Sequence, residues 1–196
     1  MIRVMVADDH EPTRQELVRE LGAGGVIQVI AQSETSDETW KVAEKLLPDI
    51  LLLDTHMPGL LATPDLLKRL SGLRRVKVVV FAGQSKASEV QELLEAGACA
   101  YILKTDPVAL VRMTILMVSK GSKNVISPSL PRHITRLAAQ ERMVLRHLTK
   151  RGKLPQIAER MGISERELTA VLEHLAGKLE LTSTAQVIKW AKKHGF

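Results

Sequence analysis

Residues 50–59 read ILLLDTHMPG, and this stretch decides the fold. Four consecutive apolar residues without polar alternation are typical of a strand that is buried on both faces, as in a parallel sheet covered by helices. The apolar run stops at Asp54. We therefore predict a strand over 50–53 whose carboxyl end presents an aspartate.

Strands and helices are expected to alternate on either side of this strand. Similar short apolar runs occupy 2–7, 26–31, 76–81 and 100–103. The segments between the runs have helical spacing, with Thr63 and Pro64 expected to cap and open the third, and they predict helices over 12–21, 36–47, 65–70, 86–96 and 107–119. This alternation predicts an α/β domain with a five-stranded parallel sheet, doubly wound in a flavodoxin-like order.

The C-terminal part of the sequence has a different pattern. From residue 137 onward no strand signal occurs, and the apolar spacing predicts helices over 139–150, 154–161, 165–179 and 184–194. Gly162 separates the second and third of these, and Ser164 with Glu167 forms a capping-box pattern, which is typical of a helix-turn-helix. We expect an α/β domain over 1–120, a Gly-, Pro- and Ser-containing linker over 121–136 and a small all-α four-helix domain over 137–196.

The two predicted domains differ in charge. Residues 1–120 carry 14 Lys/Arg and 16 Asp/Glu, whereas residues 121–196 carry 14 Lys/Arg and only 6 Asp/Glu. The net charges of −2 and +8 suggest that the second domain meets a polyanion such as DNA, although a basic surface can also serve solubility alone.

Cysteine usage and hydropathy indicate the compartment. The single cysteine, Cys99, cannot form an intrachain disulfide, and its apolar surroundings predict a buried structural thiol. No run approaches the roughly 18 apolar residues of a membrane span, and the N-terminus lacks a signal-peptide pattern. We therefore expect a soluble, cytoplasmic protein with no membrane partner.

Charged side chains follow three of the predicted strands. Asp8 and Asp9 follow the first, Asp54 follows the third, and Lys104 follows the fifth. Because the carboxyl ends of parallel strands meet at one edge of a sheet, these groups are expected to form one pocket. Carboxylate oxygens suit a hard cation such as Mg²⁺, and a carboxylate screened by a metal can accept a phosphoryl group. The alternative is that the acids only cap strand ends in loops.

Three segments carry a family resemblance. They read VADDH, LLLDTHMPG and GACAYILKTDP, at 6–10, 51–59 and 97–107. Together they resemble the signature segments of response-regulator receiver domains. The resemblance implies phosphorylation of Asp54 by a sensor histidine kinase or a small phosphodonor, with Lys104 pairing with the phosphoryl oxygens.

The same resemblance implies a metal site and a switch. Mg²⁺ would be held by Asp8, Asp9, Asp54 and the backbone carbonyl of His56. Tyr101 matches the family's aromatic switch position. Two departures from the family pattern bear on the response. Ala82 stands where the family has a Ser or Thr hydroxyl, and residues 60–64 read LLATP where an Asp-Gly pair is common. We therefore expect a muted or differently wired conformational response to phosphorylation.

The second domain resembles the helix-turn-helix output domain of NarL/FixJ (LuxR-type) regulators. The matching segments are ERMVL, IAERMGIS and KL, at 141–145, 157–164 and 178–179. The resemblance implies regulation of transcription through DNA binding, with phosphorylation favouring a homodimer. Arg166 and Thr169 on the recognition helix are the candidate base contacts, since the family's basic residue and histidine near 169 and 171 are missing. The candidate phosphate contacts are Lys150, Arg151, Lys153, Lys178 and Lys189.

Two functions remain open for this domain. The net charge of +8 favours DNA binding. The apolar Ala170 and Val171 on the recognition helix favour a receiver-controlled protein-interaction module that has lost specific DNA binding. A stand-alone enzyme is the weakest class, because no phosphate-binding loop or catalytic-triad spacing is visible. The chemistry expected is limited to phosphorylation and autodephosphorylation of the receiver itself.

Overall fold

The structure is a computed structural model, and it describes residues 1–73, 75–83, 87–130, 137, 139–150, 153–179 and 181–196. The chain divides into two compact units. The first comprises Met1–Ser85 with Glu92–Leu130, and the second comprises Lys86–Gln91 with Pro131–Phe196. Each unit is described by itself. No helix in the described ranges is long and apolar enough to cross a membrane.

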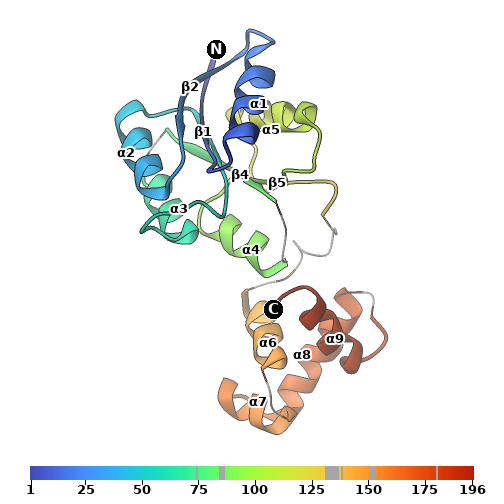
Figure 1. The fold of residues 1–196 in the computed structure, drawn as a ribbon. Helices are drawn as coiled ribbons and strands as arrows, with labels where there is room; N and C mark the ends of the chain where they lie inside the picture. Colours follow the sequence, from blue (N-terminus) through green and yellow to red (C-terminus); the bar gives the residue numbers. More distant parts are fainter. Residues whose placement is uncertain (74, 84–86, 131–136, 138, 151–152, 180) are drawn as a thin grey trace. The chain divides into compact units, whose positions relative to one another are not determined.

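The first unit is built on one parallel sheet (Figure 1). The described strands are β1 (Ile2–Ala7), β2 (Ile27–Ser33), β3 (Ile50–Leu53), β4 (Lys77–Ala82), β5 (Ala100–Leu103) and β6 (Val125–Ile126). They form a six-stranded sheet in the order β2-β1-β3-β4-β5-β6, and every pairing is parallel. The doubly wound parallel sheet expected from the alternating pattern is therefore confirmed, with one strand more than predicted.

Helices cover both faces of this sheet. They are α1 (Glu11–Gly22), α2 (Ser36–Leu46), α3 (Thr63–Ser71) and α5 (Val108–Ser119), while α4 (Ala87–Glu95) is divided between the two units because its residues up to Gln91 belong to the second. Helices α1 and α5 contact each other on one face, and α2 and α3 contact each other on the other (Figure 1). This sandwich explains why the four residues of β3 are all buried and all apolar, since neither face of the strand meets water.

The predicted capping role of Thr63 is wrong. Helix α3 begins at Thr63 itself, and its N-cap is Ala62, which makes no side-chain capping bond. The Thr63 hydroxyl instead donates to the backbone carbonyl of Thr55, 2.8 Å away. A tertiary partner has therefore replaced the local capping bond that Thr normally favours.

The sheet continues into the segment predicted as linker. Val125 and Ile126 pair with β5, and the backbone N–H of Ser127 donates to the carbonyl of Tyr101 at 2.8 Å. Leu130 is buried. The predicted linker over 121–136 is therefore corrected to exclude the stretch up to residue 130, while 131–136 lie outside the described residues. A two-residue edge strand is too short to show a periodicity in the sequence. It is stabilised instead by its backbone pairing with β5.

The second unit is helical in its described part. Its helices are α6 (Ala139–Thr149), α7 (Leu154–Met161), α8 (Glu165–Lys178) and α9 (Thr184–Lys193). The capping box at the start of α8 is confirmed: Ser164 Oγ accepts from the N–H of Glu167 at 3.2 Å, and Glu167 Oε2 accepts from the N–H of Ser164 at 2.8 Å. Gly162, with φ of 67°, makes the turn between α7 and α8 in a conformation that favours glycine.

Candidate functional site

Three carboxylates meet at the carboxyl edge of the sheet. Asp8 follows β1 and Asp54 follows β3, and these neighbouring strands pair Ala7 with Leu53, which brings the two acids side by side. One oxygen each from Asp8, Asp9 and Asp54 lies within 4.8 Å of the others. Asp8 and Asp54 are only 1% and 4% exposed, whereas Asp9 is exposed. The structure thus brings together the three acids that the strand ends indicated.

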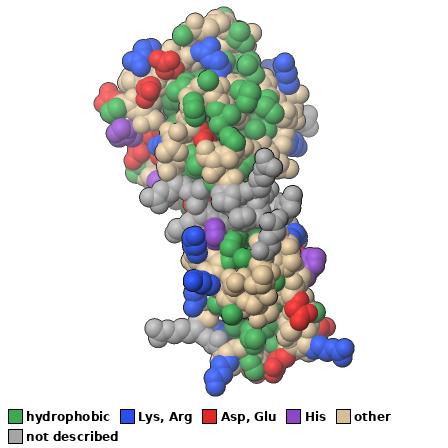
Figure 2. Space-filling model, turned by 90° about the vertical axis from the view of Figure 1, so that its right-hand side faces the viewer, with side chains coloured by type: hydrophobic (Ala, Val, Ile, Leu, Met, Phe, Trp, Pro, Cys, Tyr) green, Lys and Arg blue, Asp and Glu red, His purple; other side chains and the backbone are tan. Residues whose placement is uncertain are grey.

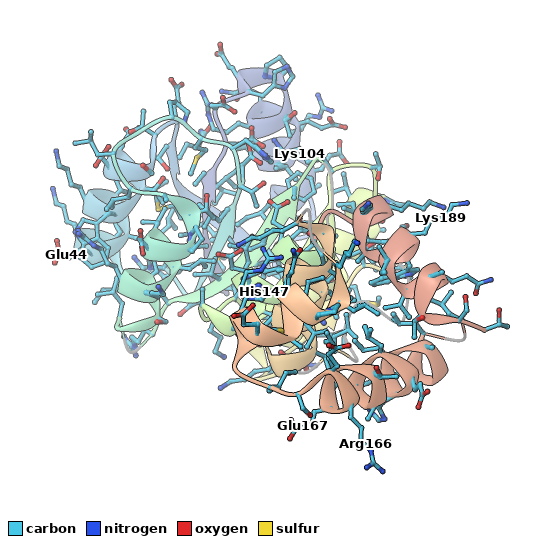
Figure 3. The ribbon with its side chains drawn as sticks, turned by 90° about the horizontal axis from the view of Figure 1, so that it is seen from below. Glu44, Lys104, His147, Arg166, Glu167 and Lys189 are labelled. Atoms are coloured by element: carbon cyan, nitrogen blue, oxygen red, sulfur yellow. The ribbon has the colours of Figure 1, made fainter. Side chains whose placement is uncertain are left out.

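Lys104 supplies the cation that faces two of these acids. Its backbone N–H donates to the carbonyl of Ala82 at 2.8 Å, which extends the β4–β5 pairing and places the lysine at the same edge. Its Nζ lies 2.7 Å from Asp8 Oδ2 and 3.1 Å from Asp54 Oδ2. Figure 3 labels Lys104 in the first unit. The ammonium therefore bridges two buried carboxylates from different strands.

Burial and the two neighbouring carboxylates shift the pKa of Lys104 in opposite directions. Burial lowers this pKa, but hydrogen bonds and Coulombic attraction from Asp8 and Asp54 raise it by more, so the pKa lies above its ordinary value of 10.5. Lys104 is therefore fully charged at neutral pH.

The acid cluster fits a hard divalent cation. Three carboxylates facing one ammonium leave a net charge of −2, and oxygen ligands are those that Mg²⁺ prefers. Asp8 Oδ2 is buried, and the ammonium of Lys104 lies 2.7 Å from it as its charge partner. Because one ammonium balances only one of the three carboxylates, a metal ion would offset the remaining cost of placing negative charge at this partly buried edge.

Two residues that sequence reasoning missed hold Asp8 in place. Asp8 Oδ1 accepts from the backbone N–H of His10 at 2.9 Å, and His10 is also the N-cap of α1. The guanidinium of the buried Arg14 donates to the backbone carbonyl of Asp8 at 2.6 Å and pairs with Glu34. The sequence signal that could have indicated Arg14 is its charge on the otherwise apolar inner face of α1.

The remaining predicted residues of this site lie beside the acids. His56 is exposed two residues after Asp54, and its Nδ1 lies 2.7 Å from Thr55 Oγ1. Ala82 is the last residue of β4 and is fully buried. Tyr101, in the middle of the neighbouring β5, is also fully buried. Cys99, predicted as buried, is only partly buried and packs against the apolar core.

The outer face of α8 carries the predicted base contacts. Arg166 is exposed and points away from the helix (Figure 3). Thr169 is exposed as well, but its hydroxyl donates to the carbonyl of Glu165 on its own helix at 2.8 Å. Ala170 is exposed and Val171 is half-buried. In the described part of α8, Arg166 is therefore the candidate with the longer reach toward a base edge.

The predicted phosphate contacts have different surroundings. Lys150, Lys153 and Lys189 are exposed, and Arg151 lies outside the described residues. Lys178 Nζ, by contrast, bonds both carboxylate oxygens of Glu141 on α6, at 2.9 and 2.7 Å. The charge of Lys178 is therefore already matched by a largely buried acid, unlike that of the exposed lysines. Sequence spacing could not show a pair that is separated by 37 residues.

An apolar cavity lies beside α8. Its volume is about 610 Å³. Helices α6, α7 and α8 and the turn after α7 contribute its walls, which comprise Met143, Val144, Met161, Ile163, Ala170 and Val171, with Glu141 and His174 as the polar members. Cavities of this size hold small ligands or side chains of partners.

Comparison with known proteins identifies both units. The family model described as "Response regulator receiver domain" matches residues 4–115. The family model described as "Bacterial regulatory proteins, luxR family" matches residues 135–191. The transcriptional regulatory protein LiaR of Bacillus subtilis is 30% identical over 210 residues, which cover 99% of this chain and 98% of LiaR. The chain belongs to the NarL/FixJ family of response regulators.

Further relatives agree with this assignment. The nitrate/nitrite response regulator protein NarL of Escherichia coli is 27% identical, with 95% of this response regulator and 93% of NarL covered. The solved structure of the RcsB response regulator of Salmonella typhimurium shares the fold with a TM-score of 0.66 at 18% identity, covering 98% of this chain and all of that one. This response regulator thus belongs to a two-component system and controls transcription.

The ammonium of Lys104 should contribute to the stability of this response regulator in a defined pH range. Its pKa is raised in the folded state, so its contribution is present below about pH 10.5 and is lost as the pH rises through the raised value. Lys104→Met should lower the free energy of unfolding at pH 7 by about 1–2 kcal/mol, less than for a fully buried pair because Lys104 is partly exposed. Urea unfolding from pH 7 to 11 measures this difference.

Lys68→Met is the matched control, because Lys68 is exposed and forms a surface pair with Asp65. It should change the free energy of unfolding by less than about 0.5 kcal/mol. A difference between the wild type and Lys104→Met that persists undiminished at pH 11 would contradict the assignment.

Proposed function

We propose that Asp54 accepts a phosphoryl group from a sensor histidine kinase or a small phosphodonor, and that this controls DNA binding by the second unit. The observation that carries the proposal is the bridge of Lys104 between Asp8 and Asp54, next to a third carboxylate. The receiver match across 4–115 supports it. The protein acts in the cytoplasm, and its own chemistry is confined to phosphorylation and autodephosphorylation of this aspartate.

The transfer requires a carboxylate nucleophile and a way to spread the phosphoryl charge. An oxygen of Asp54 attacks phosphorus, the bond from phosphorus to the donor breaks, and the donor leaves with the electron pair. Lys104 Nζ, 3.1 Å from Asp54 Oδ2, is placed to pair with the phosphoryl oxygens. Because the ammonium is already oriented by Asp8, little rearrangement is needed when the charge arrives.

Mg²⁺ is the metal we assign to this site. Asp8, Asp9, Asp54 and the backbone carbonyl of His56 would hold it. When bound, it neutralises phosphoryl charge at the acceptor. The buried Asp8 Oδ2 and the charge of the cluster are the features that support this assignment.

Phosphorylation should be confined to Asp54. The wild type, incubated with acetyl phosphate and Mg²⁺, should gain one phosphoryl group by intact-mass spectrometry, and Asp54→Asn should gain none because an amide is not a nucleophile here. Asp65→Asn, at an exposed acid on α3, should behave as the wild type. Equal labelling of Asp54→Asn and the wild type would refute Asp54 as the acceptor.

A homodimer is the proposed active form. Helix α5 is the most apolar helix of the first unit, and Met113 and Met117, one turn apart, are 51% and 39% exposed. Figure 2 views the side on which α5 lies and shows apolar side chains gathered on that face of the first unit. An apolar helix face open to solvent is typical of an association surface. A solved structure of two RcsB dimers bound to two parallel DNAs, 18% identical, has the same fold.

Restoring a hydroxyl at position 82 should strengthen the response to phosphorylation. Ala82→Thr places a donor at the end of β4, where a bond to the phosphoryl oxygens is worth about 1–3 kcal/mol. The increase in dimer fraction on adding beryllofluoride and Mg²⁺, measured by sedimentation velocity, should be larger than in the wild type. Ala82→Val has the same shape without the hydroxyl and serves as control. No difference between the Thr and Val variants would contradict this role.

For DNA binding by the second unit, we propose Arg166 as the main base contact and Thr169 as a weaker base contact. The exposed Lys150, Lys153 and Lys189 would contact phosphates, where base identity does not matter. Arg151, which lies outside the described residues, is also expected to contact phosphate. The luxR-family match across 135–191 supports the proposal.

A protein partner is the second candidate function for this unit. The apolar cavity beside α8 favours it, because two of its wall residues, Ala170 and Val171, lie where the family places groove-reading side chains. In this case the receiver would control a protein contact, and specific DNA binding would be lost.

Selection from a random DNA pool at about 150 mM salt separates the two functions. With beryllofluoride and Mg²⁺ present, we expect one enriched, two-fold symmetric motif, which Arg166→Ala abolishes. Lys189→Ala, at the proposed phosphate contact on α9, should weaken binding to all sequences alike by less than about tenfold and keep the motif. Absence of any motif in the wild type would favour the protein partner.

A further inference from the structure

The loop between β3 and α3 supplies no side chain that caps the N-terminus of α3. It runs from Asp54 to Ala62 and carries His56, whose carbonyl we assign to the metal site. The N-cap of α3, Ala62, offers no side-chain bond, and Leu60 and Leu61 before it are apolar. The backbone groups of this loop must therefore find partners elsewhere in the fold.

The first turn of α2 supplies these partners. The N–H of Leu60 donates to Asp37 Oδ2 at 2.7 Å, and the N–H of Leu61 donates to Ser36 Oγ at 3.3 Å. In return, the N–H of Ser36 donates to the carbonyl of Pro58 at 2.8 Å. The bond to Asp37 is charge-assisted and is the shortest of the three, so it is expected to be the strongest.

The fit at Gly59 shows independently how close this contact is. Gly59 has φ of 138°, which side chains rarely adopt. A Cβ added there would lie 2.1 Å from Ser36 Oγ and 2.8 Å from Asp37 Oδ2. Only glycine therefore allows the loop to lie against α2.

A second set of hydrogen bonds holds the end of the loop next to the phosphoacceptor. There the carbonyl of Thr55 accepts a hydrogen bond from Thr63 Oγ1, in the first turn of α3, at 2.8 Å. The N–H of Thr55 in turn donates to Asp54 Oδ1 at 2.7 Å. Both ends of the segment that carries His56 are thus fixed, one by Thr63 and one by Ser36 and Asp37.

We propose that Asp37, together with Ser36, is a positioning residue for the metal and phosphoacceptor site, because it holds the β3–α3 loop in place. Asp37 does not belong to the cluster of Asp8, Asp9 and Asp54 and acts only through the loop. The inference rests on the proposed function of that site. It also explains how the chain keeps an ordered loop although the Asp-Gly pair common in the family is replaced by LLATP.

Asp37→Ala, Asp37→Asn and Glu44→Ala in the full chain test the proposal. Glu44 is the matched control, because it is an exposed acid on the same helix and its removal changes the net charge equally (Figure 3). Amide exchange at Leu60, followed by NMR without metal, measures the loop contact itself. Titration calorimetry with Mg²⁺ measures the dissociation constant.

Asp37→Ala should speed exchange at Leu60 about tenfold or more, as expected for loss of a hydrogen bond to a charged acceptor. It should also raise the Mg²⁺ dissociation constant about fivefold to tenfold. Asp37→Asn should fall between Asp37→Ala and the wild type, since its amide oxygen can still accept, and Glu44→Ala should match the wild type in both measurements.

Three outcomes would overturn the proposal. Unchanged exchange in Asp37→Ala would show that the contact does not order the loop. Faster exchange with an unchanged Mg²⁺ constant would show that the loop does not position the site. Equal effects of Asp37→Ala and Glu44→Ala on the Mg²⁺ constant would show that only charge matters. A wild type that binds no Mg²⁺ would instead refute the proposed function, and the positioning role with it, while the exchange result would still report the contact.

Discussion

Two carboxylates buried at the edge of a parallel sheet need a cation, and the ammonium of Lys104 between Asp8 and Asp54 meets this constraint. The strand order places β1, β3, β4 and β5 next to one another, so the residues that follow them converge. An uncompensated carboxylate in such a place would cost several kcal/mol. The Lys104 bridge makes this burial tolerable, and it leaves negative charge where the proposed divalent cation and phosphoryl group would bind.

The surroundings of this cluster are held by backbone bonds from several elements. Arg14 and His10 fix Asp8 from α1, and Ser36 and Asp37 fix the loop beyond Asp54 from α2. The charged groups are thus oriented by elements that are themselves packed on the sheet. Preorganisation of this kind lowers the reorganisation needed when charge arrives at the site.

The second unit separates its charges. On α8 the described exposed charged residues are Glu165, Arg166, Glu167 and Glu173, whereas on α9 they are Lys189, Lys192 and Lys193. Glu167 is committed to the capping box, where the backbone and side-chain bonds of Ser164 hold its pKa below its ordinary value. The basic character of the domain therefore lies largely outside the helix that reads bases in the family, which leaves Arg166 as the proposed base contact.

Much of this architecture could be predicted, because its signals are local. The apolar run before Asp54, the capping box of Ser164 and the turn at Gly162 each depend on residues a few positions apart. The convergence of Asp8, Asp54 and Lys104 could also be predicted, since parallel strands share one carboxyl edge.

Long-range contacts could not be predicted in this way. The pairing of β6, the bond of Lys178 to Glu141 and the contact of Asp37 with Leu60 join residues that are far apart in the chain. Periodicity carries no information about such partners. The sequence by itself determined the order of elements and the chemistry at the strand ends, whereas only the tertiary structure decided which charges are matched and which loops are held, because those depend on distances across the fold.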